Sequence, residues 1–301
     1  MLASAAVSCL VIAAGHVAVA DSTVRKAVPN SAVVDQAPLP PKRVETPLTA
    51  DHNPGVFARA GKTRDALGFP AGVNRTGRHV KDGFQKTEYD EVDEVDASGQ
   101  PVSITEFDAS GRLTVAVRLD KPGLKAARVS GDAAGKSAQR ALAAAGLTAA
   151  GTPKVEASGS SDGWDVSWAR ASGTVPVRGD ETRVRLWSDG RVESVAHVEH
   201  SLAPEPARRI DVAAARQVAS RTATGWFASR GSGYKLESID LQWVGPNGAF
   251  DPNSTVDTQA SYRLAWVANV KPSGAAAEYL RLVTVFIDVE DGSIIGGDVI
   301  E

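Results

Sequence analysis

Two stretches of the sequence, WDVSWA at residues 164–169 and YRLAWV at residues 262–267, repeat one arrangement of aromatic and apolar residues. Each stretch follows a segment of helix-like composition and leads into a second apolar run that ends in Asp-Gly, at Asp189-Gly190 and at Asp291-Gly292. A unit of helix, strand, strand, turn and strand that occurs twice indicates an internal duplication. The sequence therefore predicts an α+β fold built from two tandem modules.

The composition is that of a globular protein with room for about two domains in 301 residues. With 43% apolar and 23% charged residues, the chain can form hydrophobic cores beneath an ordinary hydrophilic surface. The formal net charge of -3 provides no basic stripe that could neutralise phosphates. This charge argues against a nucleic-acid-binding protein.

Residues 1–20 contain no Lys, Arg, Asp or Glu and end in Ala18-Val19-Ala20, an A-x-A cleavage pattern. They predict a signal peptide, and hence a secreted or cell-envelope protein with no stable membrane span after cleavage. A membrane anchor is disfavoured because the apolar run is shorter than about 18 residues. A lipoprotein site at Cys9 is disfavoured because the apolar run continues past it, and a translation start upstream of Met1 stays an alternative. Since Cys9 is the only cysteine, the exported chain would have no disulfide.

Residues 21–55 contain six prolines and no apolar periodicity, so we predict an extended linker there. Residues 56–125 predict a small β-meander, because residues 102–107 and 113–119 alternate between apolar and polar with period two. Turn signals with Asp and Gly at their ends separate these strands. The two modules are then expected over residues 126–204 and 205–301.

Each module is expected to begin with a helix. Residues 132–146 form the first, with Asp132 as its N-cap and Gly146 in the left-handed position that ends it. The second helix begins at Asp211, and one continuous face of it holds Val212, Ala215, Ala219, Thr222 and Trp226.

The identical offset of the aromatic pairs predicts that Trp168 and Trp266 superpose when the two modules are overlaid.

Strands are expected to follow each helix, and residues 245–260, rich in Pro, Asn, Asp and Gly, are expected to form a long hairpin loop. Apolar runs place these strands at residues 164–170, 175–187 and 191–198 in the first module, and at 236–244, 262–270, 280–289 and 294–300 in the second.

The stretch GTVPVRGD at residues 173–180, followed by residues 184–192, resembles the "G-x-P-V-x-G … V … D-G-x-V" pattern of the fungalysin/thermolysin propeptide (FTP) domain. Residues 262–267 and 285–294 resemble the related PepSY domain. The resemblance covers roughly residues 130–301. It implies an antiparallel sheet crossed by one helix, no catalysis, no cofactor, and a role in inhibiting, chaperoning or localising a peptidase. In thermolysin-like precursors such modules precede the catalytic domain, whereas this chain contains no H-E-x-x-H motif, so we expect it to act in trans.

The predicted partner-binding surface lies on the strand at residues 175–187. Trp187 has the opposite parity to Val184 and Leu186, which favours either an exposed aromatic anchor or a position at the seam between the modules. As an anchor on an open strand, Trp187 could be changed to Ala without loss of folding, weakening binding by roughly 1–3 kcal/mol. The candidate contact residues are Val177, Arg178, Asp180, Arg183, Arg185 and Trp187.

Two motifs invite a metal interpretation. The acidic run at residues 88–96 offers Asp90, Asp93 and Asp96 as candidate Ca²⁺ ligands, although it lacks the D-x-[DN]-x-[DN]-G pattern and a solvated strand edge is the alternative. His197 and His200 are three residues apart at the end of a predicted strand. Their rings are therefore expected on opposite faces, which favours a strand end over a zinc site.

The sequence thus predicts an exported, non-catalytic PepSY-like protein that binds and modulates an extracytoplasmic hydrolase, with a peptidase as the favoured partner. One alternative is a secreted hydrolase that uses carboxylates, since a catalytic pair set by spacing in space is not visible in a linear sequence. A structural envelope protein is the other alternative.

Overall fold

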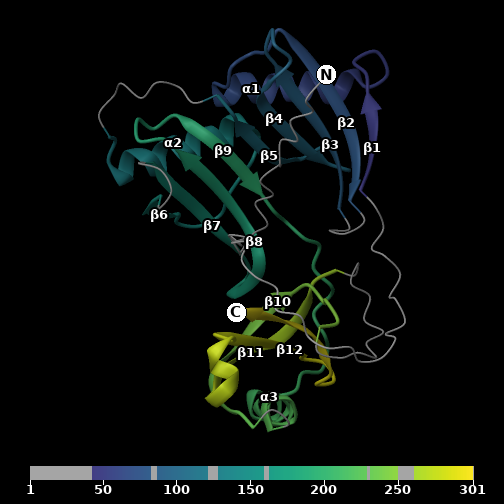
Figure 1. Ribbon diagram of the computed structural model, residues 1–301, viewed down its shortest axis with the longest axis vertical. Helices are drawn as coiled ribbons and strands as arrows, with labels where there is room; N and C mark the ends of the chain where they lie inside the picture. Colours follow the sequence, from purple (N-terminus) through teal and green to yellow (C-terminus); the bar gives the residue numbers. More distant parts are fainter. Residues whose placement is uncertain are drawn as a thin grey trace, which may run out of the picture. The chain divides into compact units, whose positions relative to one another are not determined.

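The computed structural model divides into two compact units (Figure 1). Unit 1 contains the described residues up to Trp168 together with Glu181–Val198, and unit 2 contains Ala169–Asp180 and the described residues from Glu199 onward. The predicted signal peptide and most of the predicted linker lie outside the described residues. The structure describes residues 43–82, 87–120, 128–158, 163–228, 231–249 and 261–300.

The described chain contains three helix-and-sheet modules rather than two, and the α+β class is confirmed. In each module one helix is followed by four strands that neighbour one another in chain order. A short strand, β1 (Val44–Leu48), precedes them, and a 3-10 helix, η1 (Gly274–Glu278), follows β11. Module 1 comprises α1 (Pro54–Leu67), β2 (Asn74–Asp82), β3 (Thr87–Val95), β4 (Pro101–Asp108) and β5 (Leu113–Arg118); module 2 comprises α2 (Gly131–Ala144), β6 (Lys154–Ala157), β7 (Trp164–Ser172), β8 (Val175–Leu186) and β9 (Val192–His197); module 3 comprises α3 (Val212–Ala228), β10 (Gly233–Val244), β11 (Arg263–Ser273), β12 (Leu282–Asp288) and β13 (Ile294–Ile300).

Helix α1 was not predicted, and it turns the expected meander into a complete module. Two glycines lower the helix propensity of its sequence, so its signal is weak. A Cβ on Gly61 would lie 2.9 Å from the guanidinium group of Arg75, so a larger residue there would require only that this flexible group shift. The predicted end of the linker at residue 55 is also too late, because β1 pairs with β2 and α1 begins at Pro54.

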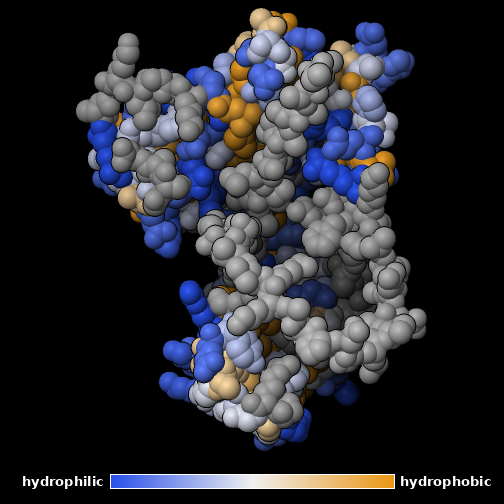
Figure 2. All heavy atoms as spheres, viewed as in Figure 1, coloured by the Kyte–Doolittle hydropathy of each residue, from blue (hydrophilic) through white to orange (hydrophobic). Residues whose placement is uncertain are grey.

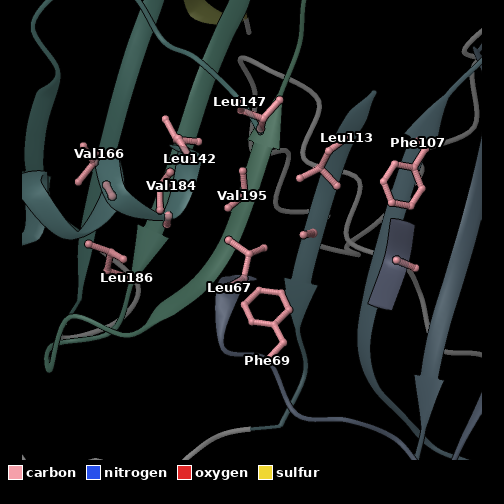
Figure 3. Packing of buried hydrophobic residues seen from close by; sticks show 14 of the residues in the cluster. Leu67, Phe69, Phe107, Leu113, Leu142, Leu147, Val166, Val184, Leu186 and Val195 are labelled. Carbon is pink, nitrogen blue, oxygen red and sulfur yellow. The ribbon is translucent and has the colours of Figure 1, made fainter. Parts of the chain in front are cut away.

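Modules 1 and 2 form one continuous sheet in unit 1, in the order β1-β2-β3-β4-β5-β9-β8-β7-β6. Their last strands, β5 and β9, pair antiparallel with Ala116 opposite Val195. Both helices cover a single hydrophobic cluster that contains Leu67 of α1, Phe69 just after that helix and Leu142 of α2. Figure 3 shows these side chains together with apolar residues from strands of both modules. The two modules of unit 1 therefore share one core.

In module 3, strands β10 to β13 form an antiparallel sheet whose core lies under α3. The buried stripe of α3 is Ala215, Ala219, Ala223 and Phe227, each four residues after the last. The predicted stripe is therefore rotated, and Val212 is 42% exposed. The side chain of Asp211 accepts a hydrogen bond from the N–H of Ala214, which marks the helix start where it was predicted.

The two repeated tryptophans lie on the helix-covered faces of their sheets. Trp168 belongs to the cluster under α2, while Trp266 packs on the cluster under α3 and donates its indole N–H to the carbonyl of Ile210 at 3.1 Å. This placement agrees with the register predicted from the repeat. At the start of α2 the N-cap is Ser130 rather than Asp132, because the Ser130 side chain accepts the N–H of Ala133.

The strands β10 and β11 pair directly, with Val244 opposite Arg263, so the intervening segment is a hairpin connection as predicted. Most of that segment lies outside the described residues. No helix among the described residues is both long and apolar enough to cross a membrane. On the face drawn in Figure 2, hydrophilic side chains lie on both units.

Replacing Ala219 with Leu tests the packing of α3. Ala219 is fully buried against the sheet, so a larger side chain must displace its neighbours and should destabilise unit 2 by about 1–3 kcal/mol. Ala213 lies on the same helix and is exposed, so Ala213→Leu is the matched control and should change stability by less than about 0.5 kcal/mol. Urea unfolding followed by circular dichroism measures both. Equal stabilities of the two variants would contradict this packing.

Candidate functional site

The first half of β8 lies in unit 2 and carries the residues that organise its polar surface. Val177 lies opposite Trp243 of β10 in a parallel bridge and packs with Leu264 and Val289. The backbone then bends at Gly179, whose φ of 81° lies in the left-handed region that favours glycine. This bend brings the next residue, Asp180, into the interior with its side chain fully buried.

Asp180 is held by three hydrogen-bond donors from two other segments. Arg170 of β7 places Nη1 at 2.7 Å from Oδ2, and the backbone N–H of His200 lies 2.9 Å from the same oxygen. The Nδ1 atom of His200 lies 2.5 Å from Oδ1. Because a carboxylate only accepts, this ring nitrogen is the donor, which fixes the orientation of the imidazole.

The segment after β9 runs beside Tyr262 and places His200 on its ring. Tyr262 donates its N–H to Ser201 O at 2.8 Å, and its carbonyl accepts the N–H of Ala203 at 2.8 Å. The rings of His200 and Tyr262 stack with centroids 4.3 Å apart and an angle of 12° between them. We call Arg170, Asp180, Glu199, His200 and Tyr262 the Asp180 cluster.

The electrostatics of the Asp180 cluster follow from these contacts. Burial alone would raise the pKa of Asp180, but the hydrogen bonds from His200 and Arg170 outweigh it and hold the pKa below its usual value. Asp180 is therefore ionised at neutral pH. Burial, together with the negative charges of Asp180 and Asp298, raises the pKa of Tyr262 to about 12, so its phenol stays protonated.

The accessible groups of the cluster are held in place by its buried ones. His200 is 45% exposed although its ring is fixed on both sides by Asp180 and Tyr262. Arg170 also donates to the carbonyl of His200 at 2.6 Å and pairs with Glu199 at 3.2 Å. Side chains fixed in this way lose little conformational entropy when they bind another molecule. The cluster can therefore act as a rigid polar contact surface.

The structure brings together only part of the predicted binding surface. Val177, Arg178 and Asp180 lie in unit 2, where Arg178 pairs with Asp298 at 2.9 Å and lies over the ring of Phe286. The predicted open strand is wrong, because in unit 1 the second half of β8 has β7 and β9 as neighbours. There Arg183 pairs with Glu181 at 2.9 Å, and Arg185 pairs with Asp165 at 3.1 Å.

Trp187 is not the exposed anchor that one alternative predicted, because it is only 8% exposed. The guanidinium groups of Arg118 and Arg191 lie 5.3 and 5.9 Å from its ring centroid. Trp187 lies just after the last residue of β8, in the turn that leads to β9, where its N–H donates to the carbonyl of Arg191 at 3.0 Å. The alternation of side chains along β8 carries no signal of these two arginines, which come from β5 and from the turn, so the sequence did not predict that the ring is covered.

The three candidate Ca²⁺ ligands do not converge. Asp90 bonds to His79 and Asp93 pairs with Arg78, while Asp96 caps its own turn through Ser98. Asp90 and Asp93 also lie on opposite faces of β3 because they are three residues apart. Among the described residues, no group of three or more His, Cys, Asp or Glu side chains is arranged to hold a metal ion.

A second polar cluster, formed by Glu91, Asp93 and Glu106 with Arg78, lies on β2 to β4 in unit 1. Glu91 and Glu106 face each other across β3 and β4, and Arg78 contacts Glu91. Burial, with the added repulsion of Asp93, raises the pKa of Glu91 to about 7. Burial also raises the pKa of Glu106 to about 7, against the opposing charges of Arg43 and Arg78.

Sequence reasoning missed Arg170 and Tyr262 as site residues and considered His200 only as a metal ligand. Their contacts join separate segments of the chain, so local sequence patterns do not predict these contacts. The one available signal is the Gly179-Asp180 dipeptide, which places an acidic residue after a bend in an apolar strand.

The sequence matches no family model and no curated protein. Among solved structures, the Bacillus megaterium YpeB C-terminal domain is similar to this chain, with a TM-score of 0.39 and 13% sequence identity. The similarity covers 81% of this chain and 97% of that chain.

The raised pKa of Glu106 predicts that unit 1 loses stability as the pH rises. Folding binds a proton that the unfolded chain releases near pH 4.5, so the stabilisation is complete below that pH and is lost as the pH rises through about 7. Between about pH 5 and pH 7.5 the free energy of unfolding should fall by roughly 2 kcal/mol for Glu106 and further for Glu91, whose pKa is also raised to about 7, so Glu106→Gln should remove only the share of Glu106. Urea unfolding at both pH values, with hydrogen exchange of the β3 and β4 amides, measures this change.

The exposed Glu156 of β6 provides the matched control, because its carboxyl lies at a sheet edge beside Lys154. Glu156→Gln should leave the pH dependence of the wild type unchanged. A Glu106→Gln protein with the same loss of stability as the wild type would show that Glu106 does not titrate in this range.

Proposed function

We propose that this chain is an exported, non-catalytic protein that binds an extracytoplasmic hydrolase of the peptidase class and modulates it by inhibition, chaperoning or localisation. The observation that carries the proposal is the Asp180 cluster, in which a buried carboxylate fixes the partly exposed side chains of Arg170 and His200. Arginine and aromatic side chains are the residue types that dominate binding energy at protein interfaces. Their fixed geometry lowers the entropy cost of association.

The peptidase class of the partner is supported by the sequence that builds the cluster. Residues 173–180, which resemble the FTP pattern, supply Asp180 itself and the neighbouring Arg178. Residues 262–267, which resemble the PepSY pattern, supply Tyr262. The two resemblances therefore meet at one surface, which is the part of the chain we assign to partner recognition.

Binding is tested by adding the purified chain to the culture fluid of the source organism and measuring peptidase activity and its half-life. The wild-type chain should change one of these quantities at saturating concentration. Arg170→Ala and His200→Ala should weaken the effect by about 5- to 150-fold in half-maximal concentration, because each removes one fixed contact. Circular dichroism shows whether each variant is folded.

Arg216→Ala is the control, since Arg216 is an exposed arginine on α3 outside the cluster. It should act like the wild type. Equal potency of Arg170→Ala, His200→Ala and Arg216→Ala would show that the Asp180 cluster is not the contact surface. A wild-type chain that alters neither the activity nor the half-life of any secreted hydrolase would overturn the proposed function.

A second candidate function, a secreted hydrolase that uses carboxylates, is favoured by the cluster of Glu91, Asp93 and Glu106. A carboxyl group with a pKa near 7 can serve as a general acid, and it requires an ionised carboxylate beside it as a base or nucleophile. The purified chain should then hydrolyse glycans or peptides near pH 6, and Glu106→Gln should abolish turnover while the protein remains folded. No turnover by the wild type across such substrates would eliminate this candidate.

A further inference from the structure

The last turn of each module ends in a glycine with nearly the same backbone conformation. Gly111, Gly190 and Gly292 have φ angles of 78°, 83° and 78°. Each lies two residues before the last strand of its module, which is β5, β9 or β13. Counting five residues onward from each glycine reaches Ala116, Val195 and Gly297. These three residues therefore occupy equivalent positions on the last strand of their modules.

In unit 1 this position is where two modules join. Ala116 and Val195 lie opposite each other at the centre of the β5–β9 ladder, between the pairs Val115–Ala196 and Val117–Ser194. The last strand of a module has one edge that faces away from the strand before it, which is its outer edge. This edge is thus able to pair with the same edge of another module. We call the outer edge of the last strand the pairing edge.

In module 3 the equivalent position is occupied by an amide side chain. Asn247, in the connection after β10, donates Nδ2–H to the carbonyl of Gly297 at 2.8 Å and accepts the N–H of Gly297 through Oδ1 at 3.0 Å. One primary amide therefore satisfies both backbone groups, as an opposing strand residue would. The backbone N–H groups of Asn247 and Gly248 also donate to the carbonyl of Ile295, at 3.1 and 3.2 Å.

The sequence of β13 is adapted to this close approach. A Cβ on Gly296 would collide with Oδ1 and Cγ of Asn247, so only glycine permits the contact. Val299 is the next residue along β13 whose backbone groups face the same way as those of Gly297. It lies past the contact with Asn247 and is 43% exposed. Among the described residues, no strand pairs with this side of β13.

We propose that the pairing edge of β13 can pair antiparallel with β13 of a second copy of the chain, centred on Gly297, and that Asn247 competes for this edge. The occupant follows from the chain itself, because β5 and β9 pair through the same edge at the same offset from the turn. The antiparallel arrangement is symmetric, so the two copies would make identical contacts. Exposed strand edges are commonly covered to prevent such association, and Asn247 supplies that cover here.

The test is the full chain with Asn247→Ala, compared with the wild type by analytical ultracentrifugation over a range of concentrations. The two side-chain hydrogen bonds no longer have to be broken before pairing, and only the two backbone bonds to Ile295 remain, so dimerisation should strengthen by about tenfold or more. The backbone N–H of Gly297 should exchange rapidly in the dilute variant and become protected as the dimer forms. Asn74→Ala is the matched control, since the Asn74 side chain bonds to the N–H of Arg75 within unit 1, and it should behave like the wild type.

A second change identifies the edge. Proline at position 299 removes an outward N–H, so Asn247→Ala with Val299→Pro should return to the monomer. A dimer that persists in this double variant would place the contact elsewhere and overturn the proposal. An Asn247→Ala protein that stays monomeric while the N–H of Gly297 exchanges rapidly would overturn it as well. Should Asn247→Ala fail to fold, Asn247→Ser is measured in its place with the same two outcomes.

Discussion

The antiparallel pairing of β5 with β9 is the contact on which unit 1 depends. Ala116 and Val195 at its centre are fully buried, and their pairing turns two short sheets into one. A single module has one small helix over a few strands and buries little apolar area by itself. Once the sheets are joined, α1 and α2 cover a single cluster, in which Phe107 of module 1 and Leu142 of module 2 are both buried. The stability of each module in unit 1 is therefore inseparable from that of the other.

Module 3 must also bury enough apolar area to be stable, and it forms its core under α3 within unit 2. Its last strand is covered by the side chain of Asn247 rather than by another strand, and β8 contributes Val177 beside β10. A polar amide can replace a strand because one of its N–H donors and its carbonyl oxygen have the spacing of a peptide group. The repeated module thus has one edge with two different covers in a single chain, and the choice between them is made by a few residues.

Local sequence patterns correctly predicted features that depend on neighbouring residues. They gave wrong predictions where contacts between distant residues determine the structure. The helices α2 and α3 follow from alanine-rich sequences with capping residues, and Asp211 caps α3 as expected. Helix α1 was missed because its two glycines, Gly55 and Gly61, weaken the helix signal. Trp187 was misplaced because the arginines that cover its ring come from β5 and from the turn before β9, which no alternation along β8 encodes. The partners of Asp180 come from segments that precede and follow it, which no periodicity encodes.

The two polar clusters show how the same cause gives opposite chemistry. Burial penalises the charged form of both Asp180 and Glu106. Asp180 receives hydrogen bonds from Arg170 and His200 that outweigh the penalty, so it stays ionised and keeps its neighbours oriented over a wide pH range. Glu106 is opposed only by the charges of Arg43 and Arg78, so burial prevails and it changes protonation near neutral pH. A permanent charge suits a fixed contact surface, whereas a carboxyl that titrates near neutrality suits proton transfer. The surroundings of Asp180 therefore support the proposed contact surface, and those of Glu106 support the alternative of a hydrolase.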